Sequence, residues 1–240
     1  GVLLTPEVSK ECLASLTWIR FSTAGITDAT YEKIHQCKKG DLQIVLYNMQ
    51  EAVRVKKEQR ASTTIGVQLL LLPDNKNEVV TMAKELKRIG VDYFTIKPFS
   101  QHPQSGNILQ VDYQEMLETE EELKEIGDEN FKIYFRAHSM RKLICKREYT
   151  QCLALPFMVY IDAKGNLWPC IVFMGKGELS YGNLYEESLE VIWEGERRKK
   201  LIQYFSKMDL ESNCRELCRL DEMNKYLSEL KYPSEHVNFI

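Results

Sequence analysis

Four cysteines in the last 90 residues place the strongest constraint on how this chain can fold. Cys152 and Cys170 have seventeen residues between them, whereas Cys214 and Cys218 have only three. The segment Gly165-Asn166-Leu167-Trp168-Pro169-Cys170 closes a predicted hairpin, so the turn delivers the second thiol at a fixed place. Four thiolates brought together in this way indicate a metal site, and the fold of the surrounding chain has to assemble it.

The composition describes the protein around that site. With 240 residues, of which 44% are hydrophobic, the chain can bury a core in one or two domains. The formal net charge of -3 comes without a long run of one sign, which argues against nucleic acid and anionic membranes as partners. The longest apolar run, Gly66 to Leu72, is far shorter than the ~20 residues of a membrane span. We find no signal peptide and expect a cytoplasmic protein, whose seven cysteines stay reduced and bind metal rather than form disulfides.

Short apolar segments alternate with amphipathic ones over the first 100 residues, which is typical of βα units and a parallel sheet. Thr5 can cap a helix whose first residue is Pro6, and Gly90 is typical of a helix end. The pattern predicts helices over 6–16, 47–57 and 77–89, and strands over 18–22, 64–72 and 93–98.

Beyond residue 99 the pattern changes, and we expect a domain boundary near residue 140. The turn Asp162-Ala163-Lys164-Gly165-Asn166 is rich in residues that tolerate positive φ, which predicts a hairpin. The expected order is a polar loop over 99–110, an acidic helix over 113–126, a strand over 131–136, hairpin strands over 157–161 and 167–172, and helices over 188–205 and 220–230.

The thiol ligands leave few candidates for the metal. Soft thiolates select zinc, Cu(I) or iron-sulfur clusters. Zinc sites usually use pairs of closely spaced ligands, and here only Cys214 and Cys218 form such a pair. The alternative is that some of these cysteines are ordinary buried residues. The other three, Cys12, Cys37 and Cys145, have no partner at ligand spacing and are interpreted as structural or incidental.

The pattern around the cysteines resembles the auxiliary-cluster domain of radical S-adenosylmethionine enzymes, called SPASM or, in its shorter form, twitch. The matching features are Cys152, twelve residues, Gly165, four residues and Cys170, followed by Gly182-Asn183-Leu184, Ser188-Leu189-Glu190-Val191-Ile192-Trp193 and the late cysteine pair. The first 136 residues are similar to the second half of the family's barrel, through Trp18-Ile19-Arg20-Phe21-Ser22, Leu71-Leu72-Pro73-Asp74-Asn75 and Ile96-Lys97-Pro98.

The resemblance implies an α/β fold. Residues 1–140 would be the C-terminal half of a partial (β/α)6 TIM-like barrel, and residues 141–240 a small α+β SPASM/twitch domain with a hairpin and helices. It implies one auxiliary 4Fe-4S cluster on Cys152, Cys170, Cys214 and Cys218, because the further cysteines of a full SPASM domain do not occur in the sequence.

The family's three-cysteine motif for the radical-generating cluster would lie upstream of Gly1. We therefore expect this chain to be part of a longer enzyme that also binds S-adenosylmethionine and a second 4Fe-4S cluster. The 240 residues alone are expected not to cleave S-adenosylmethionine.

The family's cofactor lies across the carboxyl ends of the barrel strands. There the resemblance suggests Ser22, Asn75 and Lys97 as contacts for S-adenosylmethionine, with loop or cap chemistry as the alternative for each. The basic run Arg197-Arg198-Lys199-Lys200 is interpreted as a solvated helix face.

A cluster with four protein ligands has no open iron, which favours electron transfer from a substrate radical. The resemblance implies a peptide, sugar or small metabolite as substrate, and a reductant such as flavodoxin or ferredoxin. The other hypothesis is a non-catalytic four-cysteine zinc or iron-sulfur module.

Overall fold

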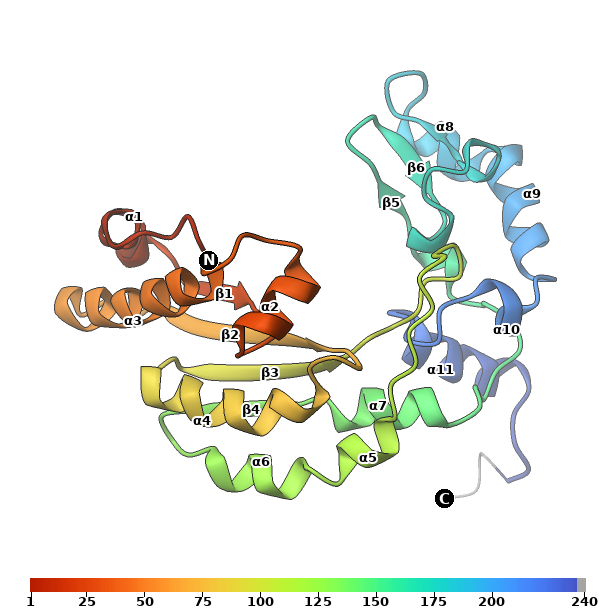
Figure 1. The fold of residues 1–240 in the computed structure, drawn as a ribbon. Helices are drawn as coiled ribbons and strands as arrows, with labels where there is room; N and C mark the ends of the chain where they lie inside the picture. Colours follow the sequence, from red (N-terminus) through yellow and green to blue (C-terminus); the bar gives the residue numbers. More distant parts are fainter. Residues whose placement is uncertain (237–240) are drawn as a thin grey trace. The chain divides into compact units, whose positions relative to one another are not determined.

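The computed structural model describes residues 1–236, and it divides the chain into two compact units (Figure 1). The first unit contains residues 1–99 and 109–144, and the second contains residues 100–108 and 145 onward. No helix in the described part is long and apolar enough to cross a membrane.

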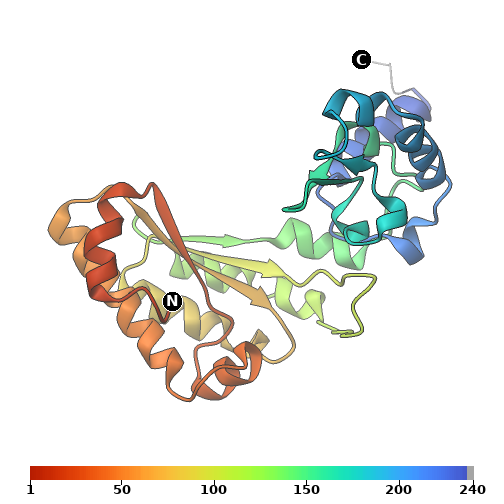
Figure 2. The same ribbon diagram turned by 90° about the horizontal axis from the view of Figure 1, so that it is seen from above.

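A parallel four-stranded sheet forms the centre of the first unit, with its strands side by side in chain order (Figure 2). The strands are β1 (Trp18–Ser22), β2 (Thr64–Leu71), β3 (Tyr93–Pro98) and β4 (Lys132–Phe135). Trp18 pairs with Thr64, Gly66 with Tyr93, and Tyr93 with Lys132. The predicted parallel α/β sheet is therefore confirmed, and β4 lies within the strand predicted over 131–136.

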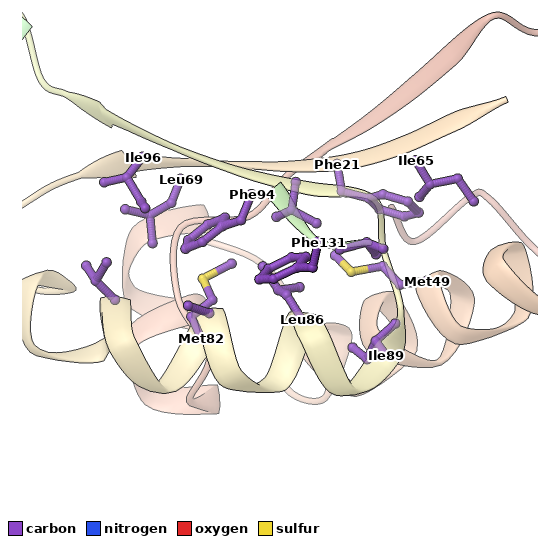
Figure 3. Close-up of a cluster of buried hydrophobic side chains, with 14 of the residues drawn as sticks. Phe21, Met49, Ile65, Leu69, Met82, Leu86, Ile89, Phe94, Ile96 and Phe131 are labelled. Atoms are coloured by element: carbon purple, nitrogen blue, oxygen red, sulfur yellow. The ribbon is translucent and has the colours of Figure 1, made fainter. Parts of the chain in front are cut away.

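Helices of the first unit supply the apolar surface that covers one face of this sheet. They are α1 (Pro6–Cys12), α2 (Asp28–His35), α3 (Asp41–Gln59), α4 (Val79–Ile89), α5 (Tyr113–Leu117), α6 (Glu120–Ile126) and α7 (Ala137–Ile144). Figure 3 shows Leu69, Phe94 and Ile96 pointing from the strands toward Met82 and Leu86 of α4, and all five are fully buried. Alternate strand residues point to the opposite face, as the pleat requires.

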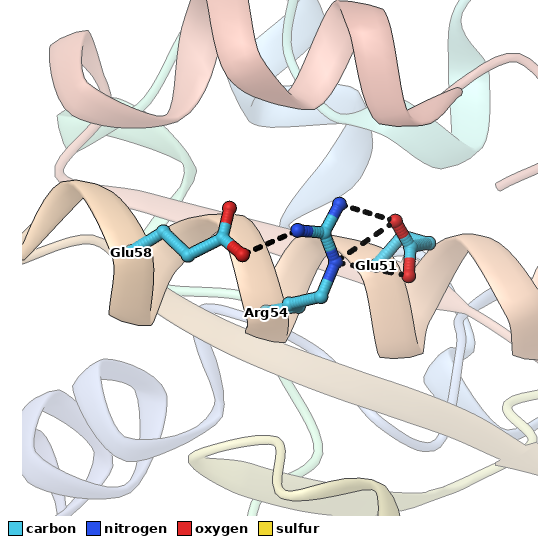
Figure 4. Close-up of polar contacts among 3 residues, drawn as sticks. All are labelled: Glu51, Arg54 and Glu58. Carbon is cyan, nitrogen blue, oxygen red and sulfur yellow. Dashed lines mark hydrogen bonds and ion pairs between the residues drawn. The ribbon is translucent and has the colours of Figure 1, made fainter.

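The outward face of α3 is solvated and carries an ion network. Arg54 donates to Glu51 one turn before it and to Glu58 one turn after it (Figure 4). Such pairs at three- and four-residue spacing support an exposed helix. They lower the pKa of the Glu51 carboxyl through its hydrogen bond with Arg54.

Several predicted bounds were wrong for local reasons. The helix predicted over 6–16 ends at Cys12, and a 3-10 turn follows it. The helix predicted over 47–57 is α3, which already begins at Asp41, directly after Gly40 with its positive φ of 85°. The predicted acidic helix is two short ones, because Thr119 donates its hydroxyl to the Met116 carbonyl and competes with the helix ladder. Helix α2 was not predicted, although Thr27 caps it by accepting from the Thr30 amide.

The described part of the second unit contains a three-stranded antiparallel sheet and several helices. They are β5 (Tyr160–Ile161), β6 (Asn166–Trp168), β7 (Gly182–Asn183), α8 (Leu189–Glu194), α9 (Glu196–Phe205), α10 (Leu210–Asn213) and α11 (Asp221–Lys231). The predicted hairpin is confirmed, with shorter strands than expected and β7 added beside β6.

The long helix predicted over 188–205 is broken at Gly195. This glycine has extended backbone and serves both as the end of α8 and as the cap of α9. A Cβ there would lie 2.8 Å from the Val191 carbonyl oxygen, so glycine is required at the break.

Candidate metal centre

Four thiols of the second unit come from four different places in the chain. Cys152 precedes a 3-10 turn at Leu155–Phe157, and Cys170 lies two residues after β6, at the start of another 3-10 turn. Cys214 caps the end of α10, and Cys218 lies three residues before α11. Because each thiol sits at the edge of a structured element, the fold rather than one local motif assembles the set.

These thiols share one environment. Cys152, Cys170 and Cys218 are half-buried and pack against the same hydrophobic cluster. Cys214 shares a hydrogen bond with Cys218, and Cys152 lies close enough for its charge to raise the pKa of the Cys214 thiol. The structure therefore brings together all four residues that the sequence predicted as metal ligands.

A small cavity of about 70 Å³ opens beside Cys170, Cys214 and Cys218. The rest of its lining is mainly apolar and includes two arginines: Tyr160, Ile171, Val172, Arg215, Leu217, Arg219 and Leu220. Apolar walls keep water away from sulfur ligands, which is one of the ways a protein tunes such a site.

Two further groups donate hydrogen bonds to the sulfurs. The Asn224 amide lies 3.6 Å from Cys152 Sγ, and the Leu220 backbone N–H donates to Cys218 Sγ at 3.3 Å. Asn224 is 1% exposed, and its other end accepts from the Ala154 amide at 2.9 Å. Asn224 was not among the residues predicted from the sequence. A polar residue between Leu220 and Leu227 on the buried face of α11 is the signal that could have found it.

Without a metal, burial and hydrogen bonding shift the pKa values of the four thiols. Burial raises the pKa of Cys152 and raises the pKa of Cys170 to about 11. The hydrogen bond between Cys214 and Cys218 raises the pKa of Cys214 and lowers that of Cys218. Metal binding at Cys152 and Cys170 would therefore have to displace protons that burial holds on their sulfurs.

The spacing of the thiols bears on what they could hold. Within residues 1–236, no three or more His, Cys, Asp or Glu side chains are grouped so that they could hold one metal ion. A zinc ion needs its sulfurs at about 2.3 Å from a single centre. A four-iron cluster binds each thiolate through a different iron and accepts wider spacing, so four soft ligands around an apolar cavity fit it better.

The residues suggested for S-adenosylmethionine lie in the first unit, at the carboxyl edge of its sheet. Ser22 is the exposed last residue of β1, and Lys97 is half-buried near the end of β3. Asn75 follows β2 and is fully buried. The three therefore share one edge of a parallel sheet.

Asn75 has a structural task in addition to any binding role. Its amide nitrogen donates to the carbonyls of Ala24 and Leu70, each at 2.9 Å, and its oxygen accepts from the Leu72 amide at 2.8 Å. These bonds fix the turn after β2 to the turn after β1.

The interpretation of residues 197–200 as a solvated face was wrong for Arg198, which is 8% exposed. Its guanidinium stacks 3.6 Å from the Trp193 ring centroid and donates to the carbonyls of Trp193 and Pro156. This arginine belongs to the packing between α9 and its neighbours in the second unit. Cys12 and Cys37 pack in the first unit, and Cys145 is exposed.

Comparison with known proteins agrees with this geometry. Residues 152–219 match the SPASM family, an iron-sulfur cluster-binding domain, and all four cysteines lie within that stretch. The resemblance of this region to a SPASM domain is thus confirmed. A search of curated proteins found no relative by sequence.

Among solved structures, the chain is similar to SuiB of Streptococcus suis. SuiB in one crystal structure is 11% identical to this chain, with a TM-score of 0.54, and the match covers 81% of this chain and 47% of SuiB. SuiB bound to S-adenosylmethionine is 12% identical, with a TM-score of 0.53, and the match covers 81% of this chain and 47% of SuiB. SuiB bound to the precursor peptide SuiA is 12% identical, with a TM-score of 0.53, and the match covers 83% of this chain and 46% of SuiB. The likeness shows the fold, and this chain spans less than half the length of SuiB.

Proposed function

Because this chain carries a SPASM iron-sulfur cluster-binding domain and has the fold of radical S-adenosylmethionine enzymes, we propose that it is the C-terminal portion of such an oxidoreductase. Its four converging cysteines, Cys152, Cys170, Cys214 and Cys218, would hold one auxiliary 4Fe-4S cluster. The observation that carries the proposal is that all four thiols of the matched stretch converge on one apolar environment.

The cluster would supply a one-electron acceptor or donor. Cys152, Cys170, Cys214 and Cys218 would each supply one thiolate, which would leave no iron open to substrate. Packing of Val172, Phe173 and Leu220 shields the half-buried sulfurs in part from water. Asn224 and the Leu220 amide place hydrogen bonds on two of them. These features favour electron transfer from a substrate radical over substrate binding.

In the longer protein, we propose that Ser22 and Lys97 contact S-adenosylmethionine at the carboxyl edge of the sheet. That edge is where parallel α/β folds hold ligands, and SuiB was solved with this cofactor bound. Asn75 would shape the same edge through its backbone hydrogen bonds and present its remaining oxygen lone pair.

A peptide is the first substrate class to test, since SuiB was solved with a precursor peptide. A sugar or a small metabolite is the next. A flavodoxin or ferredoxin would supply electrons.

The test of the cluster uses the full chain purified without oxygen and reconstituted with iron and sulfide. We expect a brown protein with about equal iron and acid-labile sulfide. Cys170→Ala or Cys214→Ala should lose most of the visible absorption, since each removes a ligand. Cys37→Ala is the matched control, because this cysteine lies in the first unit.

A colourless wild-type chain that retains one zinc would support the non-catalytic zinc module instead. Equal loss of colour in Cys37→Ala would show that the ligand set is wrong.

A further inference from the structure

Two arginines of the second unit stand beside the thiols, and neither is explained by ligation. Arg215 lines the cavity together with Cys170 and Cys218. Arg147 donates to the Leu210 carbonyl at 3.0 Å and to the Arg215 carbonyl at 2.7 Å. Both side chains are half-buried, so two positive charges are held close to the sulfurs.

Arg215 has a buried donor with nothing to donate to. Its Nη2 lies 3.5 Å from the Ser100 carbonyl oxygen, at the limit of a hydrogen bond. Its Nε–H is buried and has no hydrogen-bond partner within residues 1–236. An unsatisfied donor on a charged group is costly, so it indicates an acceptor that the protein atoms themselves do not provide.

The charges of the two arginines act on the thiols. Arg215 lines the cavity with Cys170, Cys214 and Cys218, and Arg147 is held at the carbonyl of Arg215, the residue after Cys214. A guanidinium placed beside a sulfur ligand favours its negatively charged form.

We propose that Arg215 donates its Nε–H to the auxiliary cluster or to a ligand sulfur, and that Arg215 and Arg147 together raise the cluster's reduction potential. The proposal rests on the cluster proposed above. Four thiolates outweigh the charge of an iron-sulfide core, and reduction adds another negative charge. A neighbouring cation and a hydrogen bond to sulfur both favour the reduced form.

Other charges lie around the site. Asp221 is buried and accepts from the Tyr149 hydroxyl at 3.0 Å. It opposes the arginines but is one charge against two. Arg219 also lines the cavity but is exposed, so solvent screens its charge.

Arg215 is the residue to test, because the hydrogen bonds of Arg147 also hold the chain around α10. The full chain is reconstituted, and each variant is compared at matched iron and sulfide content. The reduction potential is measured by a titration followed by electron paramagnetic resonance, and iron-sulfur stretching frequencies are measured by resonance Raman spectroscopy.

Arg215→Gln should shift the potential to more negative values and change the stretching frequencies. The reduction potential of Arg215→Lys should stay close to that of the wild type, because lysine keeps the positive charge. The iron-sulfur stretching frequencies should change, because the Nε–H is lost. Arg219→Gln is the control and should shift the potential much less than Arg215→Gln.

Unchanged potential and frequencies in a cluster-containing Arg215→Gln protein would overturn the proposal. If that variant does not retain a cluster, Arg215→Lys decides, and wild-type stretching frequencies there would overturn the hydrogen bond. Failure of the wild-type chain to form any cluster would instead overturn the proposed function, so the two failures are distinguishable.

Discussion

Asp162 organises the hairpin that delivers Cys170. Its carboxylate accepts from the backbone amides of Lys164 and Asn166, at 2.8 Å and 3.0 Å, and from the Trp168 indole N–H at 2.9 Å. Hydrogen bonds from Asn166 and Trp168 lower the pKa of this carboxyl to about 2. One side chain thereby joins the turn to β6, the strand that ends two residues before Cys170.

Replacing Asp162 by Asn should lower the thermal midpoint of the second unit near neutral pH. The wild-type carboxylate has a folded pKa below its unfolded value of about 3.9, so its contribution to stability is complete above that pH. It is lost as the pH falls through about 2. Thermal melts between about pH 6 and about pH 3 should therefore show a weaker pH dependence in the variant. Equal slopes for the two proteins would contradict this role.

At the residue scale, the four cysteines that converge were predictable and their surroundings were not. The four cysteines carry their signal in spacing and residue type, which survive without a structure. Asn224 and Arg215 act through positions that exist only once α10 and α11 are folded around the thiols. Arg198 is likewise read as a surface residue until its contact with Trp193 is seen.

At the scale of elements, strands were predicted better than helix ends. Strand β3 begins and ends where the pattern placed it, because the helix end at Gly90 and the proline at position 98 mark its limits. Breaks such as the one at Gly195 depend on a single backbone conformation and leave the amphipathic pattern on both sides intact. The strand β7 has only two residues, too few for any periodic signal.

The pairing of β2 with β3 depends on Gly66. A Cβ at this position would lie 2.0 Å from Cζ of Tyr93, whose ring covers the glycine and stacks edge-on with Tyr134. Gly66→Ala should therefore displace the ring and lower the free energy of unfolding by about 1–3 kcal/mol. Chemical denaturation would measure this loss, and much of it should disappear when Tyr93→Ala is added.

Gly127→Ala is the matched control in the same unit, because its new Cβ would meet neighbours only at ordinary contact distance. A loss from Gly66→Ala that persists unchanged in the Tyr93→Ala background would argue against the steric explanation.

At the scale of the whole molecule, the two units differ in what holds them together. The first has a large core between sheet and helices, formed mainly by apolar side chains. The second has two small cores, and three of the four cysteines pack against one of them. A small core gains little stability by itself, so units of this kind depend on a metal site as a staple.

Loss of the cluster should therefore loosen the second unit and leave the first unchanged. Hydrogen exchange measured by mass spectrometry on reconstituted wild-type protein and on Cys170→Ala would test this. Amides around β6 and α11, which flank the thiols, should exchange at least tenfold faster in the variant, corresponding to about 1.4 kcal/mol of lost protection. Amides of β2 and β3 should not change, and Cys37→Ala should match the wild type throughout. Equal acceleration in both units would mean that the chain unfolds as one cooperative body, and that the cysteine site stabilises all of it.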